Sequence, residues 1–254
     1  MSSTPSIARA SLTSILGALD AQVTPSVEPL LPDNNIIYAI VGKKGSGKSS
    51  LLLSLLNSKR AFRHRFQHIH MISPTSRGDK KFKKLVEELD EGGKYHEQYT
   101  EAVVTGIFNQ IKLLNDQHEA RKKKRKREIR HLLILDDCMT DISPSKGAML
   151  SRLIITSRHL HTSVVITTQK YNCLPCLIRA QLDLLSVFKS FNTREVNSLQ
   201  EDLSIDPHMF HEIYDFCTDE PFSFMHVNLL TSPLTFYKKF DRLEIDLDDL
   251  KRRK

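Results

Sequence analysis

The stretch Val41-Gly42-Lys43-Lys44-Gly45-Ser46-Gly47-Lys48-Ser49-Ser50 decides the fold of this chain. It matches the pattern G-x-x-x-x-G-K-[ST] at every fixed position. An apolar, β-branched run at 36–41 precedes it and predicts a buried strand, and the leucine-rich run at 51–56 that follows predicts a buried helix. A strand, a glycine-rich turn and a helix in this order are the context of a phosphate-binding P-loop.

The residue types in the loop suit a nucleoside triphosphate with its metal ion. Glycines let backbone N–H groups turn inward and surround a phosphate at a helix N-terminus. We expect Lys48 to reach the β- and γ-phosphates and the Ser49 hydroxyl to ligate Mg²⁺, so the expected cofactors are ATP and Mg²⁺. The alternative is a chance glycine-rich turn before a core helix. The predicted nucleotide-binding residues are Gly42, Lys43, Lys44, Gly45, Ser46, Gly47, Lys48, Ser49 and Ser50.

A second motif, His131-Leu132-Leu133-Ile134-Leu135-Asp136-Asp137, predicts a buried strand that ends in two acids, as in a Walker B motif. We expect Asp136 to hold Mg²⁺ through its water shell. Asp137 is expected to polarise the attacking water, a role that a glutamate usually has in such ATPases. The sequence between the two motifs predicts a helix, a strand at 66–72 and a helix at 103–114, which suits α/β crossover connections.

A third predicted strand, 163–169, ends in Gln169. If it neighbours the P-loop strand, Gln169 lies beside the γ-phosphate and senses ATP or positions water; otherwise the glutamine only caps a loop. Further elements follow along the chain. They are a strand at 182–188, helices at 193–203 and 207–216, and a closing hairpin of 222–228 and 234–237. The predicted fold class is α/β, with a mostly parallel sheet flanked by helices and a C-terminal β-hairpin.

Three segments are expected along the chain. Residues 1–34 form an N-terminal arm rich in Ser, Thr, Ala and Pro, either a short amphipathic helix or a disordered tail. Residues 35–240 form the P-loop domain. Residues 241–254 form an exposed tail with charges of both signs.

The composition suits a globular protein with an anionic partner. Of 254 residues, 40% are hydrophobic and 26% charged. We expect no membrane span, because no apolar run approaches ~20 residues, and no secretion, because the N-terminus lacks the pattern of a signal peptide. Four cysteines suggest a reducing compartment. A net charge of +7 favours nucleic acid as the partner.

The densest positive charge is the run Arg121–Arg127. Three interpretations stay open: a nuclear-localisation signal, a contact with the DNA backbone, or a solvated helix end. We favour DNA contact slightly, because the whole chain is basic. The candidate contact residues are Lys122, Lys123, Lys124 and Arg125.

With these motifs, the chain resembles the viral genome-packaging ATPases of the FtsK–HerA class, found in poxviruses, other large DNA viruses, virophages and Polinton-like elements. The resemblance covers roughly residues 35–240, and its most discriminating part is the series Arg-His…Ser-Val…Gln. The segments that carry it are Val41–Ser50, Ile72-Ser73-Pro74-Thr75, Leu135-Asp136-Asp137, Ser157-Arg158-His159, Ser163-Val164, Gln169, Leu174-Pro175, Ile178-Arg179, Phe188 and Phe222-Ser223-Phe224.

The resemblance implies a RecA-like core and a homo-oligomeric ring. It also implies ATP-driven translocation of double-stranded DNA into a preformed capsid, with contacts to phosphates that are insensitive to sequence. A capsid or portal-vertex protein would then be a partner, in the virion or in the cytoplasm or nucleus of the host cell. By the same resemblance Arg158 is the leading candidate for an arginine finger acting on the neighbouring subunit, with Arg152 and Arg179 as alternatives. We expect Arg158 near the catalytic edge of the sheet. The basic run 121–127 departs from the family pattern.

Two other functions are compatible with a P-loop: a small-molecule or nucleotide kinase, and a nucleotide-binding scaffold without catalysis. A kinase needs a lid and an acceptor pocket, whereas the Asp136-Asp137 pair and Gln169 suit a motor ATPase better. The intact Lys48, Ser49, Asp136 and Asp137 argue against a scaffold.

Overall fold

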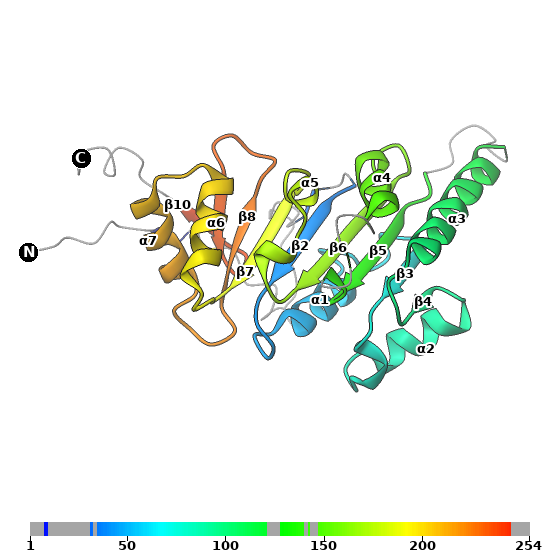
Figure 1. Ribbon diagram of the computed structural model, residues 1–254, viewed down its shortest axis with the longest axis horizontal. Helices are drawn as coiled ribbons and strands as arrows, with labels where there is room; N and C mark the ends of the chain where they lie inside the picture. Colours follow the sequence, from blue (N-terminus) through cyan, green and yellow to red (C-terminus); the bar gives the residue numbers. More distant parts are fainter. Residues whose placement is uncertain are drawn as a thin grey trace, which may run out of the picture.

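The P-loop strand lies inside one large sheet. The computed structural model describes residues 8–9, 31–32, 35–120, 128–139, 142 and 147–244. Over these residues the strands form a 10-stranded sheet in the order β1-β10-β9-β8-β7-β2-β6-β5-β3-β4 (Figure 1). Strand β2 (Ile37–Val41) pairs in parallel with β6 on one side and with β7 on the other.

Six neighbouring strands of the sheet are parallel, and the remaining four are antiparallel. The parallel strands are β2, β3 (His68–Ile72), β4 (Tyr95–His96), β5 (His131–Asp136), β6 (Thr162–Thr168) and β7 (Leu184–Phe188). The antiparallel strands are β8 (Phe224–Asn228), β9 (Thr235–Lys238), β10 (Asp241–Glu244) and β1 (Ala8–Arg9). Parallel strands put their carboxyl ends at one edge of the sheet, so the loops after β2, β5 and β6 meet there.

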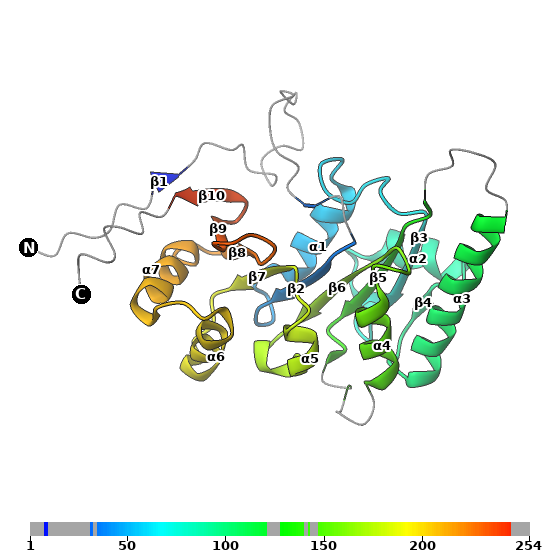
Figure 2. The ribbon, with the colours of Figure 1, turned by 90° about the horizontal axis from the view of Figure 1, so that it is seen from above.

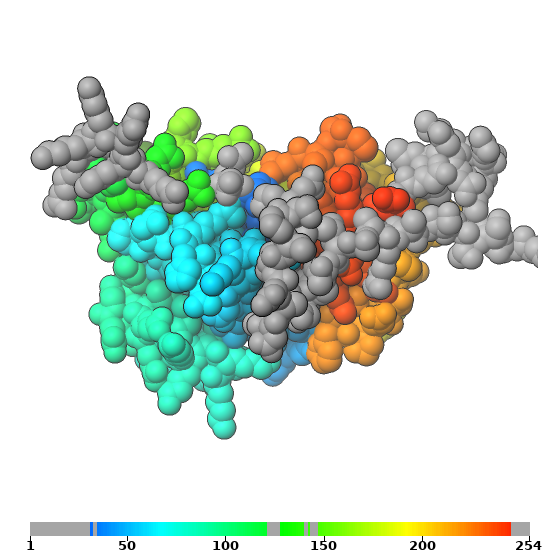
Figure 3. Space-filling view, turned by 180° about the vertical axis from the view of Figure 1, so that it is seen from behind, coloured from blue at the N-terminus to red at the C-terminus, as the bar shows by residue number. Residues whose placement is uncertain are grey.

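Helices cover both faces of the sheet (Figure 2). One face carries α1 (Lys48–Asn57) and α2 (Lys83–Glu91), whose apolar side chains join one buried cluster. The other face carries α3 (Glu101–Ala120), α4 (Ala148–Thr156), α5 (Cys176–Arg179), α6 (Thr193–Leu203) and α7 (Pro207–Cys217). Seen from behind, the blue-to-cyan chain that follows β2 occupies one side of the molecule and the orange and red C-terminal part the other (Figure 3).

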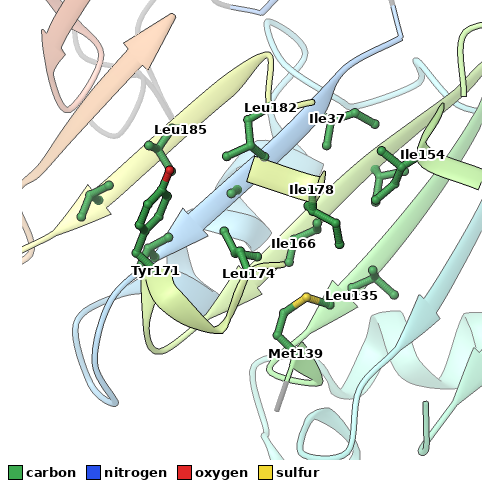
Figure 4. Packing of buried hydrophobic residues seen from close by; sticks show 14 of the residues in the cluster. Ile37, Leu135, Met139, Ile154, Ile166, Tyr171, Leu174, Ile178, Leu182 and Leu185 are labelled. Carbon is green, nitrogen blue, oxygen red and sulfur yellow. The ribbon is translucent and has the colours of Figure 1, made fainter. Parts of the chain in front are cut away.

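The alternation of side chains along β2 divides the core into these two layers. Ile37, Ala39 and Val41 belong to the cluster under α3–α7, and Tyr38 and Ile40 belong to the cluster under α1 and α2. This is the period of two that a strand imposes. Figure 4 shows the first cluster, in which side chains from β2, β5, β6 and β7 meet those of α4 and α5. The P-loop therefore extends from a strand that is packed on both faces.

The predicted fold class is confirmed, with some elements that the sequence pattern did not reveal. Helix α2 and the two-residue strand β4 lie between the predicted strand at 66–72 and the predicted helix at 103–114, where no helix or strand was expected. Residues 241–244, which were expected to begin an exposed tail, form strand β10 instead, because their backbone pairs with β9. Ala8–Arg9 of the predicted arm pairs with β10; the rest of the arm to residue 30, and the tail from 245, lie outside the described residues. Among the described helices, none is both long and apolar enough to cross a membrane.

Candidate active site

The P-loop turns from β2 into α1 through two left-handed glycines. Gly45 has φ +79° and Gly47 has φ +110°, values that side chains with a Cβ rarely adopt. A Cβ on Gly42 would lie 2.6 Å from Ser46 Oγ and 2.8 Å from Phe188 Cβ, so this position has no room for a side chain. Gly47 caps α1 without a side-chain hydrogen bond. The first N–H groups of the helix are therefore available to an anion.

Lys48 points back into the loop. Its side chain is only 6% exposed, and Nζ donates to the carbonyl oxygens of Gly42 at 2.7 Å and Lys43 at 3.4 Å. Nζ also lies 3.9 Å from Asp137 Oδ1. Burial lowers the pKa of Lys48, and the charges of Asp137 and Asp136 partly oppose that effect. A buried ammonium at this position attracts an incoming phosphate.

Asp136 is held rigidly at the end of β5 by three hydroxyl groups. Ser73 and Ser76 donate to its Oδ2 at 2.9 Å and 2.8 Å, and Thr167 donates to its Oδ1 at 2.6 Å. The side chain is 4% exposed. Because both oxygens are already bonded to fixed hydroxyls, the arrangement suits a carboxylate that orients the water shell of a metal ion.

Asp137 lies one residue further on, in a left-handed conformation with φ +51°. Its N–H donates to the carbonyl oxygen of Thr167 at 3.2 Å and to Thr167 Oγ1 at 3.1 Å, so its backbone is fixed against the end of β6. Burial raises the pKa of Asp137, while Lys48 and a hydrogen bond with Gln169 act in the opposite direction. A carboxyl group with a raised pKa is suited to accept a proton from water.

Gly45, Gly47, Lys48, Asp136 and Asp137 line one cavity of about 440 Å³. Two buried polar atoms near it, Ser46 Oγ and Asp137 Oδ1, have no hydrogen-bond partner among the described residues. Mg²⁺ is usually held by one or two carboxylates together with substrate phosphates, and Asp136 and Ser49 provide the protein groups for that arrangement. The residues present thus fit Mg²⁺-ATP. The lining residues are Lys44, Gly45, Gly47, Lys48, Ser49, Ser50, Thr75, Ser76, Asp79, Lys81, Phe82, Asp136, Asp137, Gln169 and Phe222.

The structure brings most predicted site residues together, but not Arg158. Gln169 follows β6 at the P-loop edge, as expected for a strand that neighbours β2. Arg158 precedes β6 and therefore lies at the amino edge of the sheet; its expected position near the catalytic edge is wrong. The seven residues of β6 separate the two edges by roughly 20 Å. Arg158 instead pairs with Asp183, 3.5 Å away, and its side chain is 75% exposed.

The two alternative arginines have partners within the fold. Arg179 donates to Asp202 and to the sulfur of Cys176 and lies over the ring of Tyr171. Arg152 lies over the ring of Phe108, 5.3 Å from its centroid. The four candidate DNA-contact residues, Lys122 to Arg125, lie outside the described residues.

The sequence did not indicate the three hydroxyl residues that hold Asp136. Ser73 directly follows β3, and Thr167 lies in β6 opposite Asp136 in the parallel register. The sequence signal for these residues is a small polar side chain at the carboxyl end of each strand that neighbours β5. It is informative only when the order of the strands is known.

The sheet order, the P-loop and the two acids at the end of β5 together define a RecA-like P-loop ATPase. Solved structures with this fold include the genome-packaging NTPase B204 of Sulfolobus turreted icosahedral virus 2 in complex with ATP-gammaS. It has a TM-score of 0.55 and 15% identity over 82% of this chain and 98% of that one. Another is the pCW3 conjugation coupling protein TcpA, with a TM-score of 0.52 and 15% identity over 87% of this chain and 66% of that one.

Residues 30–211 match the Poxvirus A32 protein family, and the chain belongs to that family. The match confirms the predicted resemblance to viral genome-packaging ATPases. A curated relative, Uncharacterized protein 015R of Frog virus 3 (isolate Goorha), is 28% identical over 153 residues. That similarity covers 60% of this chain and 44% of the relative, so the chain spans less than half of the relative's length.

Proposed function

We propose that this chain hydrolyses ATP to drive double-stranded DNA into a preformed capsid during virion assembly in the infected cell. The observation that carries the proposal is one cavity in which the P-loop lysine, Lys48, lies beside Asp136 and Asp137, in a chain of the Poxvirus A32 protein family. Family membership also argues against a small-molecule kinase.

Different side chains have different roles in ATP hydrolysis. The P-loop N–H groups and Lys48 bind the phosphates and offset the negative charge that develops on them. Asp137 accepts a hydrogen bond from the attacking water, and Gln169, hydrogen-bonded to Asp137, keeps that carboxylate in place. Asp136 is positioned by Ser73, Ser76 and Thr167. When bound, Mg²⁺ supplies charge neutralisation at the phosphate oxygens.

Arg158 is proposed to act on the nucleotide of a neighbouring subunit. Its side chain is 75% exposed at the edge of the sheet opposite its own nucleotide cavity. A long exposed arginine there can meet only a nucleotide that belongs to another copy. This supports a ring in which the amino edge of one subunit faces the carboxyl edge of the next.

The test is ATP hydrolysis with and without duplex DNA. We expect hydrolysis to rise with DNA of any sequence, and the rise to disappear with increasing salt because the contacts are to phosphates. Lys48→Ala should abolish turnover in a folded protein. Lys59→Ala is the matched control, because Lys59 is exposed and lies just beyond the far end of α1. Normal turnover in folded Lys48→Ala would refute the ATPase assignment. ATP hydrolysis whose rate does not change when duplex DNA is added would refute the proposed DNA motor.

A further inference from the structure

The loop between α7 and β8 presents an aromatic ring to solvent at the nucleotide cavity. Phe222 is 67% exposed, whereas the neighbouring Phe224 and Phe188 are 1% and 3% exposed. Its backbone has φ +61°, a left-handed conformation that is uncommon for a bulky side chain. Strain of this kind clusters at ligand-binding sites, and here it holds an apolar ring out of the core.

The sheet order places Phe222 on one particular side of the P-loop. Strand β8 is antiparallel to β7, and Phe224 pairs with Phe188, so the residues just before β8 lie at the same edge as the P-loop. From β2, the acids of β5 lie in one direction and β7 and β8 lie in the other. The γ-phosphate belongs beside Asp137, so the nucleoside extends toward β8 and Phe222.

The ring is within contact distance of the phosphate-binding loop. A Cβ built on Gly47 would lie 3.5 Å from Phe222 Cδ1. Phe222 lines the same cavity of about 440 Å³ as Lys48, Asp136 and Asp137. The other aromatic residue in that lining, Phe82, is 1% exposed and belongs to the core. In the described chain, Phe222 is therefore the aromatic surface of this cavity that a ligand can cover.

We propose that Phe222 is the stacking platform for the nucleobase of the bound nucleotide. The inference rests on the proposed function, since it requires a nucleotide at the P-loop. Stacking on an aromatic face tolerates every base, because each base has a π-face. Selectivity then follows ring area, with purine nucleotides bound more tightly than pyrimidine nucleotides.

Calorimetric titration of the full chain with Mg²⁺ and either AMPPNP or inorganic tripolyphosphate separates the base from the phosphates. We expect Phe222→Ala to weaken AMPPNP about tenfold, which is within the range for loss of base stacking, and to leave tripolyphosphate unchanged. Phe222→Leu keeps an apolar side chain against Gly47 but has no π-face, so it should behave like the alanine variant. Phe222→Trp should bind AMPPNP as the wild type does. In the wild type ATP should bind more tightly than CTP, and Phe222→Ala should reduce that difference.

Phe191→Ala is the matched control. Phe191 is also strongly exposed, at 76%, but it lines a separate cavity on the other side of the P-loop, where Lys43 Nζ lies 4.5 Å from its ring centroid. AMPPNP binding that weakens in Phe191→Ala and not in Phe222→Ala would overturn the inference. So would equal losses of AMPPNP and tripolyphosphate in Phe222→Ala, or a change in oligomeric state alone. A wild-type chain that binds neither ligand would instead refute the proposed function.

Discussion

Thr167→Val tests whether the hydroxyls around Asp136 hold a charged carboxylate. Thr167 is fully buried in β6, and its Oγ1 donates to Asp136 Oδ1 at 2.6 Å and accepts from the N–H of Asp137 at 3.1 Å. Valine keeps the shape and the β-branch but removes the hydroxyl. Asp137 retains its backbone bond to the carbonyl oxygen of Thr167, so the main loss is the bond to the carboxylate.

The size of the effect follows from the charge on the acceptor. A hydrogen bond to a charged group contributes about 1.5–3 kcal/mol, compared with about 1 kcal/mol for a neutral pair. We therefore expect Thr167→Val to lower the free energy of unfolding by about 2 kcal/mol, a decrease of roughly 4–8 °C in Tm for a domain of this size. Because Asp136 also loses one of its positioning contacts, Mg²⁺-dependent nucleotide binding should weaken as well.

Thr162→Val is the control on the same strand. Thr162 is equally buried, and its hydroxyl donates to the neutral carbonyl oxygen of Leu160 at 3.0 Å. This variant should lose about 1 kcal/mol and bind nucleotide normally. Thermal melts and urea titrations of both variants give the comparison. A Thr167→Val protein no less stable than Thr162→Val, with unchanged Mg²⁺ dependence, would refute the view of Asp136 as a charged group held by hydroxyls.

Three further predictions concern catalysis and DNA. Asp137→Asn should bind ATP but not hydrolyse it, whereas Asp136→Asn should weaken Mg²⁺-dependent binding; equal loss of binding in both would contradict this division. Arg158→Ala should bind ATP normally but turn it over ~10³-fold more slowly, with partial recovery on mixing with Lys48→Ala subunits. If Arg158 only pairs with Asp183, Arg158→Ala should lower the thermal stability and leave ATP turnover unchanged, and mixing should recover no activity. Replacing Lys122–Arg125 by alanine should flatten the salt dependence of duplex binding. An unchanged slope would mean that the basic run is a nuclear-localisation signal or a solvated helix end.

The P-loop could be predicted from sequence because it is a local structure. Gly45 and Gly47 supply the left-handed turn, and the apolar runs on either side specify the strand and the helix that hold it. The surroundings of Asp136 could not be predicted in the same way. Ser73 and Thr167 are 63 and 31 residues away in the sequence and reach Asp136 only through the parallel register of β3, β5 and β6.

The elements missed by the sequence pattern are short or lie at the sheet margin. Strand β4 has two residues, too few for any periodicity to appear, and β10, next to the edge strand β1, has Leu243 as its one apolar residue among three charged ones. The position of Arg158 is a different case. Given a parallel sheet, a residue just before a strand lies at the amino edge, and a residue just after it, such as Gln169, lies at the carboxyl edge. Nearness to β6 alone does not place Arg158; the direction of that strand does.

The separation of Arg158 from the nucleotide cavity has a consequence for assembly. In an isologous dimer, Arg158 reaches the partner's cavity only if both edges of each subunit lie in one self-complementary interface. A heterologous contact, in which the amino edge of one subunit meets the carboxyl edge of the next, brings Arg158 to a nucleotide without that requirement. Such contacts repeat until they close into a ring or extend as a filament. The proposed arginine finger therefore favours the proposed ring. ATP binding at the P-loop depends on neither, so a chain that binds ATP as a monomer but hydrolyses it only when assembled is the behaviour this geometry implies.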